Sequence, residues 1–170
     1  MKKLLAIVGL IGFAAFAAAP AFADQADGKD TTTFEVKANV ESSCKFTIAS
    51  PVDFGALNVY NFGTQQKEGS VTVLCTSGPN YNIELDLGAN ASGSQRQMKK
   101  NGSAHFLAYD LFQNAAHDVA WGSGTDAQSF LGDGTRQVLT VYGQMNWAEG
   151  LLASAPVGSY LDVVTATVNF

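Results

Sequence analysis

The feature that most constrains this fold is a two-residue alternation of apolar and polar side chains, which recurs along the chain. It is clearest in FEVKANVE, residues 34–41, whose apolar set is Phe34, Val36, Ala38 and Val40. This is the period of a β-strand with one buried face. No segment has a convincing helical period, so we expect an all-β protein.

Six further segments read as strands. They span residues 43–49, 70–76, 80–87, 106–113, 136–143 and 159–170. The stretch 88–103 is rich in Gly, Asn and Ser and reads as a loop, and glycines from Gly122 to Gly134 punctuate a long irregular segment. Short strands between such turns predict an antiparallel sandwich or barrel.

The strand count leaves the role of FEVKANVE open. The simplest immunoglobulin-like sandwich has about seven strands, and the six segments above fall one short. FEVKANVE supplies a seventh, but at the opposite end of the chain from where a last strand belongs. The residues alone equally allow it to be the first strand of a complete domain.

The first 23 residues have the layout of a secretory signal peptide. Lys2 and Lys3 form a charged region, an apolar run follows, and Ala21-Phe22-Ala23 is a small-x-small cleavage site. We expect cleavage before Asp24. The remainder has no apolar stretch long enough to span a bilayer as a helix.

The exported part is acidic and carries both cysteines. The formal net charge of −5 becomes −7 once the two lysines of the signal peptide are removed. An acidic surface argues against nucleic acid and anionic membranes as partners. Cys44 and Cys75 form an even pair in an oxidising compartment, so we expect one disulfide between them.

A search for catalytic, metal or cofactor chemistry is negative. His105 and His117 have no second histidine or cysteine at a spacing typical of a metal site. There is no G-x-S-x-G, and the Gly-rich stretches 121–125 and 131–135 do not match a phosphate-binding loop. We therefore expect no enzyme and no cofactor.

Taken in order, several pieces of the chain resemble the spore coat protein U family, and within it the pilin subunits of archaic, Csu-type chaperone–usher pili. The pieces are FEVKANVESSC, VDFGALNVYNFG, SVTVLCTSG, LAYDLFQNAA and GSYLDVVTATVNF. They cover the whole mature chain and include both cysteines and the terminal Phe170.

The resemblance implies an immunoglobulin-like antiparallel sandwich that is incomplete, with six strands and an apolar groove beside the C-terminal strand. A periplasmic chaperone fills the groove first. At the outer-membrane usher, the N-terminal strand of another pilin subunit replaces it, which is a form of β-augmentation. The implied protein is a structural subunit of a surface pilus for adhesion and biofilm formation, exported through the periplasm to the cell surface.

The resemblance also assigns regions and residues. Residues 24–41 form a polar tail with the donor strand, and residues 42–170 form the pilin domain. The expected donor side chains are Phe34, Val36, Ala38 and Val40. The expected groove residues on the C-terminal strand are Val164, Ala166, Val168 and Phe170.

Two other functions fit parts of the sequence. One is a secreted spore-coat or matrix protein of the same family that self-associates without forming a pilus. The other is a small outer-membrane β-barrel, since such proteins often end in Phe after alternating apolar residues, as VVTATVNF does.

Overall fold

The computed structural model describes residues 31–170. The expected signal peptide and residues 24–30 lie outside the described residues. The chain divides into two units, one ending at Ala38 and one spanning Asn39–Phe170. Residues 31–38 of the first unit carry no strand or helix, and every described strand belongs to the second unit.

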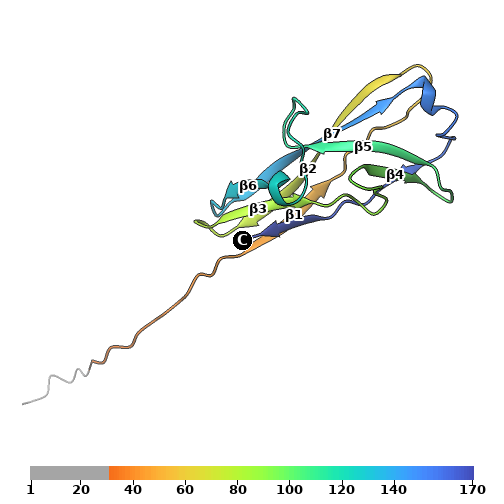
Figure 1. The fold of residues 1–170 in the computed structure, drawn as a ribbon. Coiled ribbons are helices and arrows are strands. Elements are labelled where there is room, and N and C mark those ends of the chain that lie inside the picture. The colour runs from red at the N-terminus through yellow and green to blue at the C-terminus, as the bar shows by residue number, and fades with distance from the viewer. Residues whose placement is uncertain (1–30) are drawn as a thin grey trace, which may run out of the picture. The chain divides into compact units, whose positions relative to one another are not determined.

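The second unit is built almost entirely of antiparallel strands (Figure 1). They are β1 (Cys44–Ser50), β2 (Gly63–Cys75), β3 (Asn80–Leu85), β4 (Arg96–Lys100), β5 (Phe106–Phe112), β6 (Gln128–Leu131), β7 (Arg136–Trp147), β8 (Tyr160–Leu161) and β9 (Ala166–Asn169). Two short 3-10 turns, Gly124–Asp126 and Glu149–Leu151, interrupt the connections.

The strands form two sheets. The larger has the order β1-β2-β7-β5-β4-β8 and the smaller the order β6-β3-β9. The longest ladder joins β2 to β7, from Gly63 opposite Trp147 to Leu74 opposite Arg136. The all-β, antiparallel sandwich expected from the sequence is therefore confirmed.

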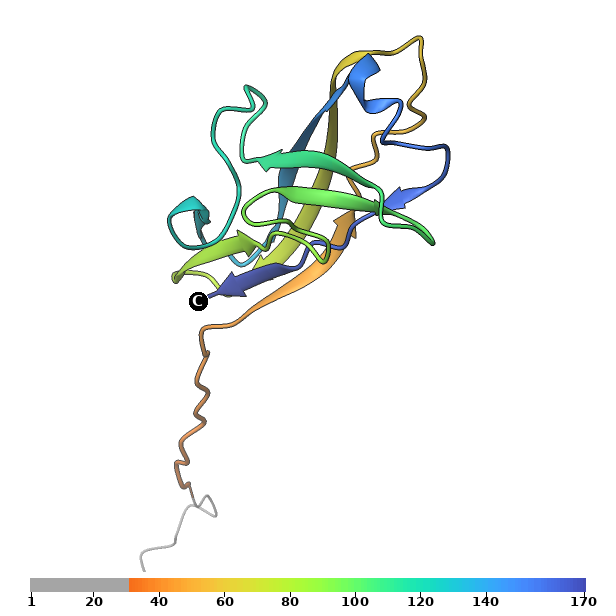
Figure 2. The ribbon, with the colours of Figure 1, turned by 45° about the vertical axis from the view of Figure 1, so that its right-hand side comes forward.

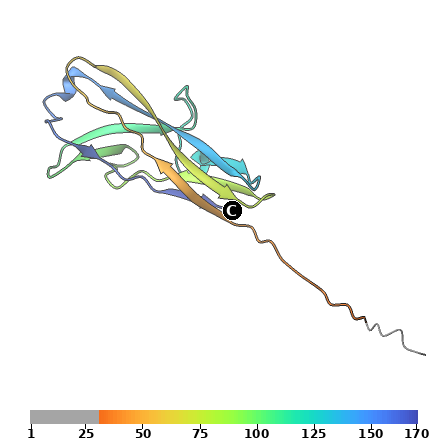
Figure 3. The same cartoon turned by 180° about the vertical axis from the view of Figure 1, so that it is seen from behind.

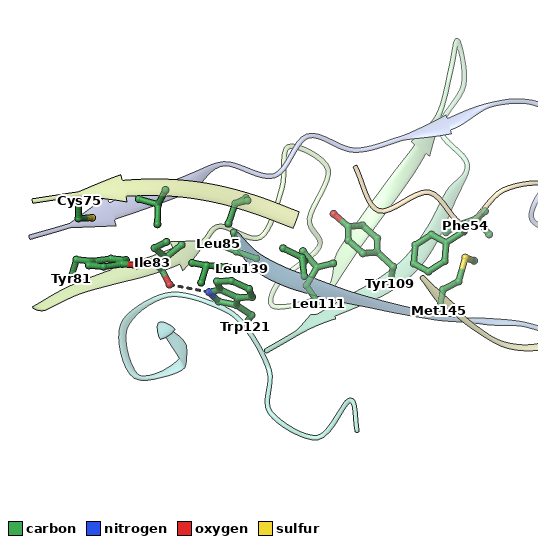
Figure 4. Close-up of a cluster of buried hydrophobic side chains, with 14 of the residues drawn as sticks. Phe54, Cys75, Tyr81, Ile83, Leu85, Tyr109, Leu111, Trp121, Leu139 and Met145 are labelled. Atoms are coloured by element: carbon green, nitrogen blue, oxygen red, sulfur yellow. Dashed lines mark hydrogen bonds between the residues drawn. The ribbon is translucent and has the colours of Figure 1, made fainter. Parts of the chain in front are cut away.

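Period-two burial explains how the sheets pack together. In β3 the side chains of Tyr81, Ile83 and Leu85 are buried, whereas those of Asn80 and Asn82, at the alternate positions, are exposed. They meet apolar side chains of β2, β5 and β7 in a single core (Figure 4). Each fully buried aliphatic or aromatic side chain contributes about 1.5–3 kcal/mol of transfer free energy.

Two side chains with polar groups are buried in the sandwich with their hydrogen bonds satisfied. Trp121 is fully buried, and its indole N–H donates to the carbonyl of Ile83 at 2.9 Å (Figure 4). The guanidinium of Arg96 donates to the carbonyls of Leu85, Asp86 and Trp121 at 2.8–3.0 Å. These bonds offset the cost of burying polar groups.

The segment that follows β1 packs across β2 and β7 and requires a residue without a side chain beneath it. A Cβ on Gly143 would lie 2.3 Å from Cγ1 of Val52 and 3.3 Å from the ring of Phe54. A Cβ on Gly69 would lie 2.7 Å from the carbonyl oxygen of Ser50. Glycine at these positions lets Val52 and Phe54 cover this part of the core.

The strand count differs from the six expected, because the described residues form nine strands. β4 lies in the stretch 88–103, which we expected to be a loop, and β6 lies in the irregular Gly-rich segment. β2 begins at Gly63 rather than near residue 70, and residues 159–170 contain two short strands rather than one. Pairing with a neighbour makes β4 and β6 extended although their own residues show no clear alternation.

None of the helices in the described part of the chain is long and apolar enough to cross a membrane.

Candidate functional site

Each of the two sheets ends in strands that have one open edge in the described residues, and β1 and β9 are two of these edge strands. β1 pairs only with β2, and β9 pairs only with β3. The two strands nevertheless lie side by side, one from each sheet (Figures 1 and 2). Open edges present unpaired backbone N–H and C=O groups, which are a template for another strand.

β1 and β9 run in opposite directions. β1 starts at Cys44, which lies opposite Cys75 at the end of β2. Only residues 76–79 separate Cys75 from β3, and Asn82 near the start of β3 lies opposite Asn169 near the end of β9. The start of β1 and the C-terminus therefore share one end of the sandwich, which we call the C-terminal pole (Figure 3).

A cavity of about 540 Å³ lies between these two strands and reaches down to the core. We call it the β1–β9 groove. Its lining residues are Phe46, Ala49, Ser50, Pro51, Val52, Ser70, Val71, Leu85, Tyr109, Leu111, Val141, Asp162, Val164 and Ala166. The lining is mostly apolar and comes from both sheets. The groove is therefore a place where the two sheets leave the hydrophobic core uncovered.

Residues 162–168, which run into β9, present both side chains and backbone groups to the groove. Asp162, Val164, Ala166 and Val168 are half-buried, and the residues between them are exposed. The carbonyls of Val163 and Thr165 accept bonds from the β3 side, from the amides of Ala89 and Asp86 at 3.1 and 3.0 Å. Because backbone groups of successive residues point to opposite sides of an extended strand, those of the even-numbered residues face the open edge.

Asp86 fixes this edge in place. One oxygen of its carboxylate accepts the amide N–H of Thr165 and that of Gly88, both at 2.9 Å. Partial burial opposes ionisation, but these hydrogen bonds outweigh it and hold the pKa of Asp86 below its usual value. A surface carboxylate thus positions the segment just before β9.

One end of the groove is polar. The hydroxyl of Tyr109 donates to one carboxylate oxygen of Asp162 at 2.7 Å, and the other oxygen accepts the backbone and side-chain N–H groups of Asn90 at 3.1 and 2.9 Å. Burial raises the pKa of Tyr109, and the bond to Asp162 raises it further. The apolar groove therefore ends at a carboxylate that lies eight positions before the C-terminus.

The disulfide expected from the sequence is present. Cys44 and Cys75 are bonded and are directly opposite each other in the β1–β2 ladder, with their Cα atoms 4.1 Å apart. It attaches the edge strand β1 to β2 at the C-terminal pole. The bridge closes a loop with a sequence separation of 31 residues, for which the chain-entropy relation gives roughly 4 kcal/mol.

The expected groove residues are not all equivalent. Val164 and Ala166 line the groove, whereas Val168 packs against the core and Phe170 at the C-terminal pole is 58% exposed. Most of the lining was not anticipated from the sequence. Val71 and Leu85 lie within expected strands, but the alternation does not reveal which buried residues border a gap.

The expected donor residues are exposed in the described chain. Phe34 and Val40 are each 84% exposed and Val36 is 85% exposed, and Ala38 is exposed as well. Phe34, Val36 and Val40 thus leave three large apolar side chains without a packing partner in the described chain. Their use as a donor strand stays a prediction at this point.

Both histidines make polar contacts within the described residues. Within residues 31–170, no group of three or more His, Cys, Asp or Glu side chains is placed to hold a metal ion. His117 contacts Gln66 through Nδ1, and His105 contacts the carbonyl of Ser154 at 3.0 Å.

Comparison with known proteins gives a family and a fold. The family model described as the Spore Coat Protein U domain matches residues 30–167. The chain is similar to a structure of the CsuC–CsuE chaperone–tip adhesion subunit pre-assembly complex from the archaic chaperone–usher Csu pili of Acinetobacter baumannii, with 26% identity and a TM-score of 0.53. That match covers 77% of this chain but only 40% of the matched chain.

Two further structures share the fold at low identity. The P pilus rod subunit PapA matches with 14% identity and a TM-score of 0.52, over 74% of this chain and 97% of that one. A subunit from a chaperone–usher pilus structure matches with 15% identity and a TM-score of 0.50, over 85% and 96%. None of the curated proteins matches the chain in sequence.

Proposed function

The chain belongs to the Spore Coat Protein U domain family, and on this basis we propose that it is a structural pilin subunit that polymerises by donor-strand complementation. In this proposal residues 24–41 carry the donor strand, and residues 42–170 form the pilin domain that accepts one. The protein's role is mechanical, and it has no catalytic step or cofactor.

The observation that carries the proposal is the β1–β9 groove. It lies between two open strand edges, it is about 540 Å³ in volume, and it is lined mainly by apolar side chains from both sheets. A strand inserted there can form backbone hydrogen bonds with β1 on one side and β9 on the other, and can bury alternate side chains in the core.

The segment FEVKANVE has the properties that such an inserted strand needs. Its apolar residues lie on one face and are exposed in the described chain. Burying Phe34, Val36 and Val40 contributes about 1.5–3 kcal/mol for each side chain, before backbone hydrogen bonds are counted. Glu35, Lys37 and Asn39 lie on the other face and stay in solvent.

The export route follows from the same groove. An open groove with an apolar lining and unpaired strand edges is prone to aggregation, so the subunit needs a temporary partner before assembly. The CsuC–CsuE structure is a pre-assembly complex of a chaperone with a tip adhesion subunit. We therefore propose a periplasmic chaperone and an outer-membrane usher as partners, other pilin subunits as the final partners, and the cell-surface pilus as the location.

The test is to delete residues 31–40 from the mature chain. Because each inserted strand would be buried in the core of its neighbour, the wild-type protein should form oligomers that resist SDS without heating and appear as fibres by electron microscopy. The deletion variant should keep the sandwich and the disulfide but form no such oligomers. Normal fibres from the deletion variant would contradict the proposal, and SDS-resistant oligomers without fibres would indicate a self-associating coat protein instead.

A further inference from the structure

We infer that the donor strand of one copy pairs antiparallel with β9 of another copy in a single register, in which Ser42 meets Asp162. This inference rests on the proposed function. It takes antiparallel pairing as part of that function and adds a register and the polar residue pair that fixes it.

The first observation is that alternate residues of the donor strand, read forwards, match alternate residues of the last strand, read backwards. The groove-facing donor positions read Phe34, Val36, Ala38, Val40 and Ser42. Read backwards from the C-terminus, alternate positions are Phe170, Val168, Ala166, Val164 and Asp162. An antiparallel pair in this register places Phe beside Phe, Val beside Val and Ala beside Ala, and a hydroxyl beside a carboxylate.

The backbone of the β9 edge fits this register. The backbone groups of Val164, Ala166 and Val168 face the open edge, because the residues between them bond toward β3. These residues can therefore exchange hydrogen bonds with Val40, Ala38 and Val36 of the incoming strand. Their half-buried side chains then lie on the same face as those of the donor.

The polar end of the groove favours this register over one that is shifted by two residues. The Asp162 carboxylate accepts three hydrogen bonds, from Tyr109 and Asn90, and a carboxylate has about four lone-pair sites. The Ser42 hydroxyl can donate to the remaining site. A slip of two residues would instead press Val40 against the carboxylate and desolvate it without a new hydrogen bond.

The opposite strand polarity gives a poorer match. With the donor parallel to β9, Thr32 meets Asp162, and the pairs become Phe34 with Val164, Val36 with Ala166 and Val40 with Phe170. Thr32 also supplies a hydroxyl. Removing the Ser42 hydroxyl therefore tests the antiparallel arrangement, and removing the Thr32 hydroxyl tests the parallel one.

The inferred register can form only between two molecules, because the chain from Ser42 to Cys44 is too short to reach Asp162 of the same molecule. Ser42 is two residues from Cys44, a reach of about 7 Å. Cys44 lies at the C-terminal pole with Phe170, and Asp162 is eight extended residues from Phe170, about 26 Å. Ser42 of a chain cannot reach its own Asp162, so the donor that meets Asp162 comes from another copy.

Cysteine pairs in the full mature chain test the register. Directly opposed residues have Cα atoms about 4.5–5.5 Å apart, within the range for a disulfide. The variant with Val40→Cys and Val164→Cys should form heat-stable covalent ladders after oxidation. The variant with Val40→Cys and Phe170→Cys reports the parallel polarity, and the variant with Val40→Cys and Asp162→Cys reports the slipped register. Ladders from either of these two in place of the first overturn the inference.

Two conservative variants test the polar pair without new cysteines. Ser42→Ala should speed dissociation of SDS-resistant oligomers about tenfold, the worth of one charge-assisted hydrogen bond, and Thr32→Ala should leave the rate unchanged. The reverse ranking overturns the inference. If the wild-type chain forms no unheated ladder at all, the proposed function fails, whereas a wild-type ladder with cross-linking in the wrong pair overturns the register alone.

Discussion

Replacing Val36 with Asp should separate assembly from folding. Val36 is 85% exposed in the described chain, so its own domain loses no packing, and a surface substitution of this kind changes the free energy of unfolding by no more than about 0.5 kcal/mol. In the proposed fibre the same side chain is buried in the groove of another copy, where a Val contributes about 1.5–3 kcal/mol.

The loss on association is larger than that contribution. An Asp at this position loses the burial of Val36 and must also place a carboxylate in an apolar groove, which adds at least about 1–3 kcal/mol. A total of roughly 2.5–6 kcal/mol corresponds to association that is at least about 60-fold weaker. The assay combines denaturant unfolding of the monomer with the time course of SDS-resistant oligomers on unheated gels.

Lys37→Ser is the matched control. Lys37 is the next residue along the chain and lies on the opposite, solvent-facing side of the strand, so its replacement should alter neither stability nor assembly appreciably. The reasoning is refuted if V36D lowers the free energy of unfolding by several kcal/mol, which would make residues 34–41 the first strand of their own domain. It is also refuted if Lys37→Ser impairs assembly as much as V36D.

Three further predictions concern the domain itself. Replacing Cys44 and Cys75 by Ala should lower the free energy of unfolding by roughly 4 kcal/mol, measured by denaturant titration against the oxidised wild type. Gly143→Ala should cost about 1–3 kcal/mol, because the new Cβ would lie 2.3 Å from Val52; an unchanged midpoint would show that the segment after β1 is loosely packed. The pKa of Asp86 is lowered in the folded protein, so its ionised carboxylate stabilises the fold above the ordinary carboxyl pKa, and this contribution is lost as pH falls through the folded pKa. In Asp86→Asn the free energy of unfolding, measured by denaturant titration at several pH values, should therefore fall less steeply at acid pH.

The sequence predicts the fold class well because the core strands have one buried face. β3, β5 and β7 alternate in burial as their residues do, from Tyr81 to Leu85 and from Leu107 to Leu111. β4 was missed because its only fully buried residue, Arg96, is charged and is tolerated only through three backbone carbonyls that other segments bring to it. Pairing to a neighbour, rather than local pattern, determines such strands.

The groove is harder to predict than the strands around it. Alternation identifies Val164 and Ala166 as facing inward, but whether an inward face is covered depends on which strands end up at the edges of the two sheets. That order is a property of the folded topology. Asp162 illustrates the limit, since it continues the inward-facing series of the last strand, yet only the structure places it with Tyr109 and Asn90 at the end of the groove.

If the missing strand of each sandwich comes from another molecule, two variants that are each defective in one half of the interaction should complement each other when mixed. One variant lacks residues 31–40 and so keeps only its groove. The other carries Ala166→Arg, which obstructs its groove but leaves its donor strand intact. Neither variant alone should form SDS-resistant species, and their mixture should form a heterodimer and nothing larger. SDS-resistant oligomers from either variant alone, or no heterodimer under conditions in which the wild type polymerises, would contradict it.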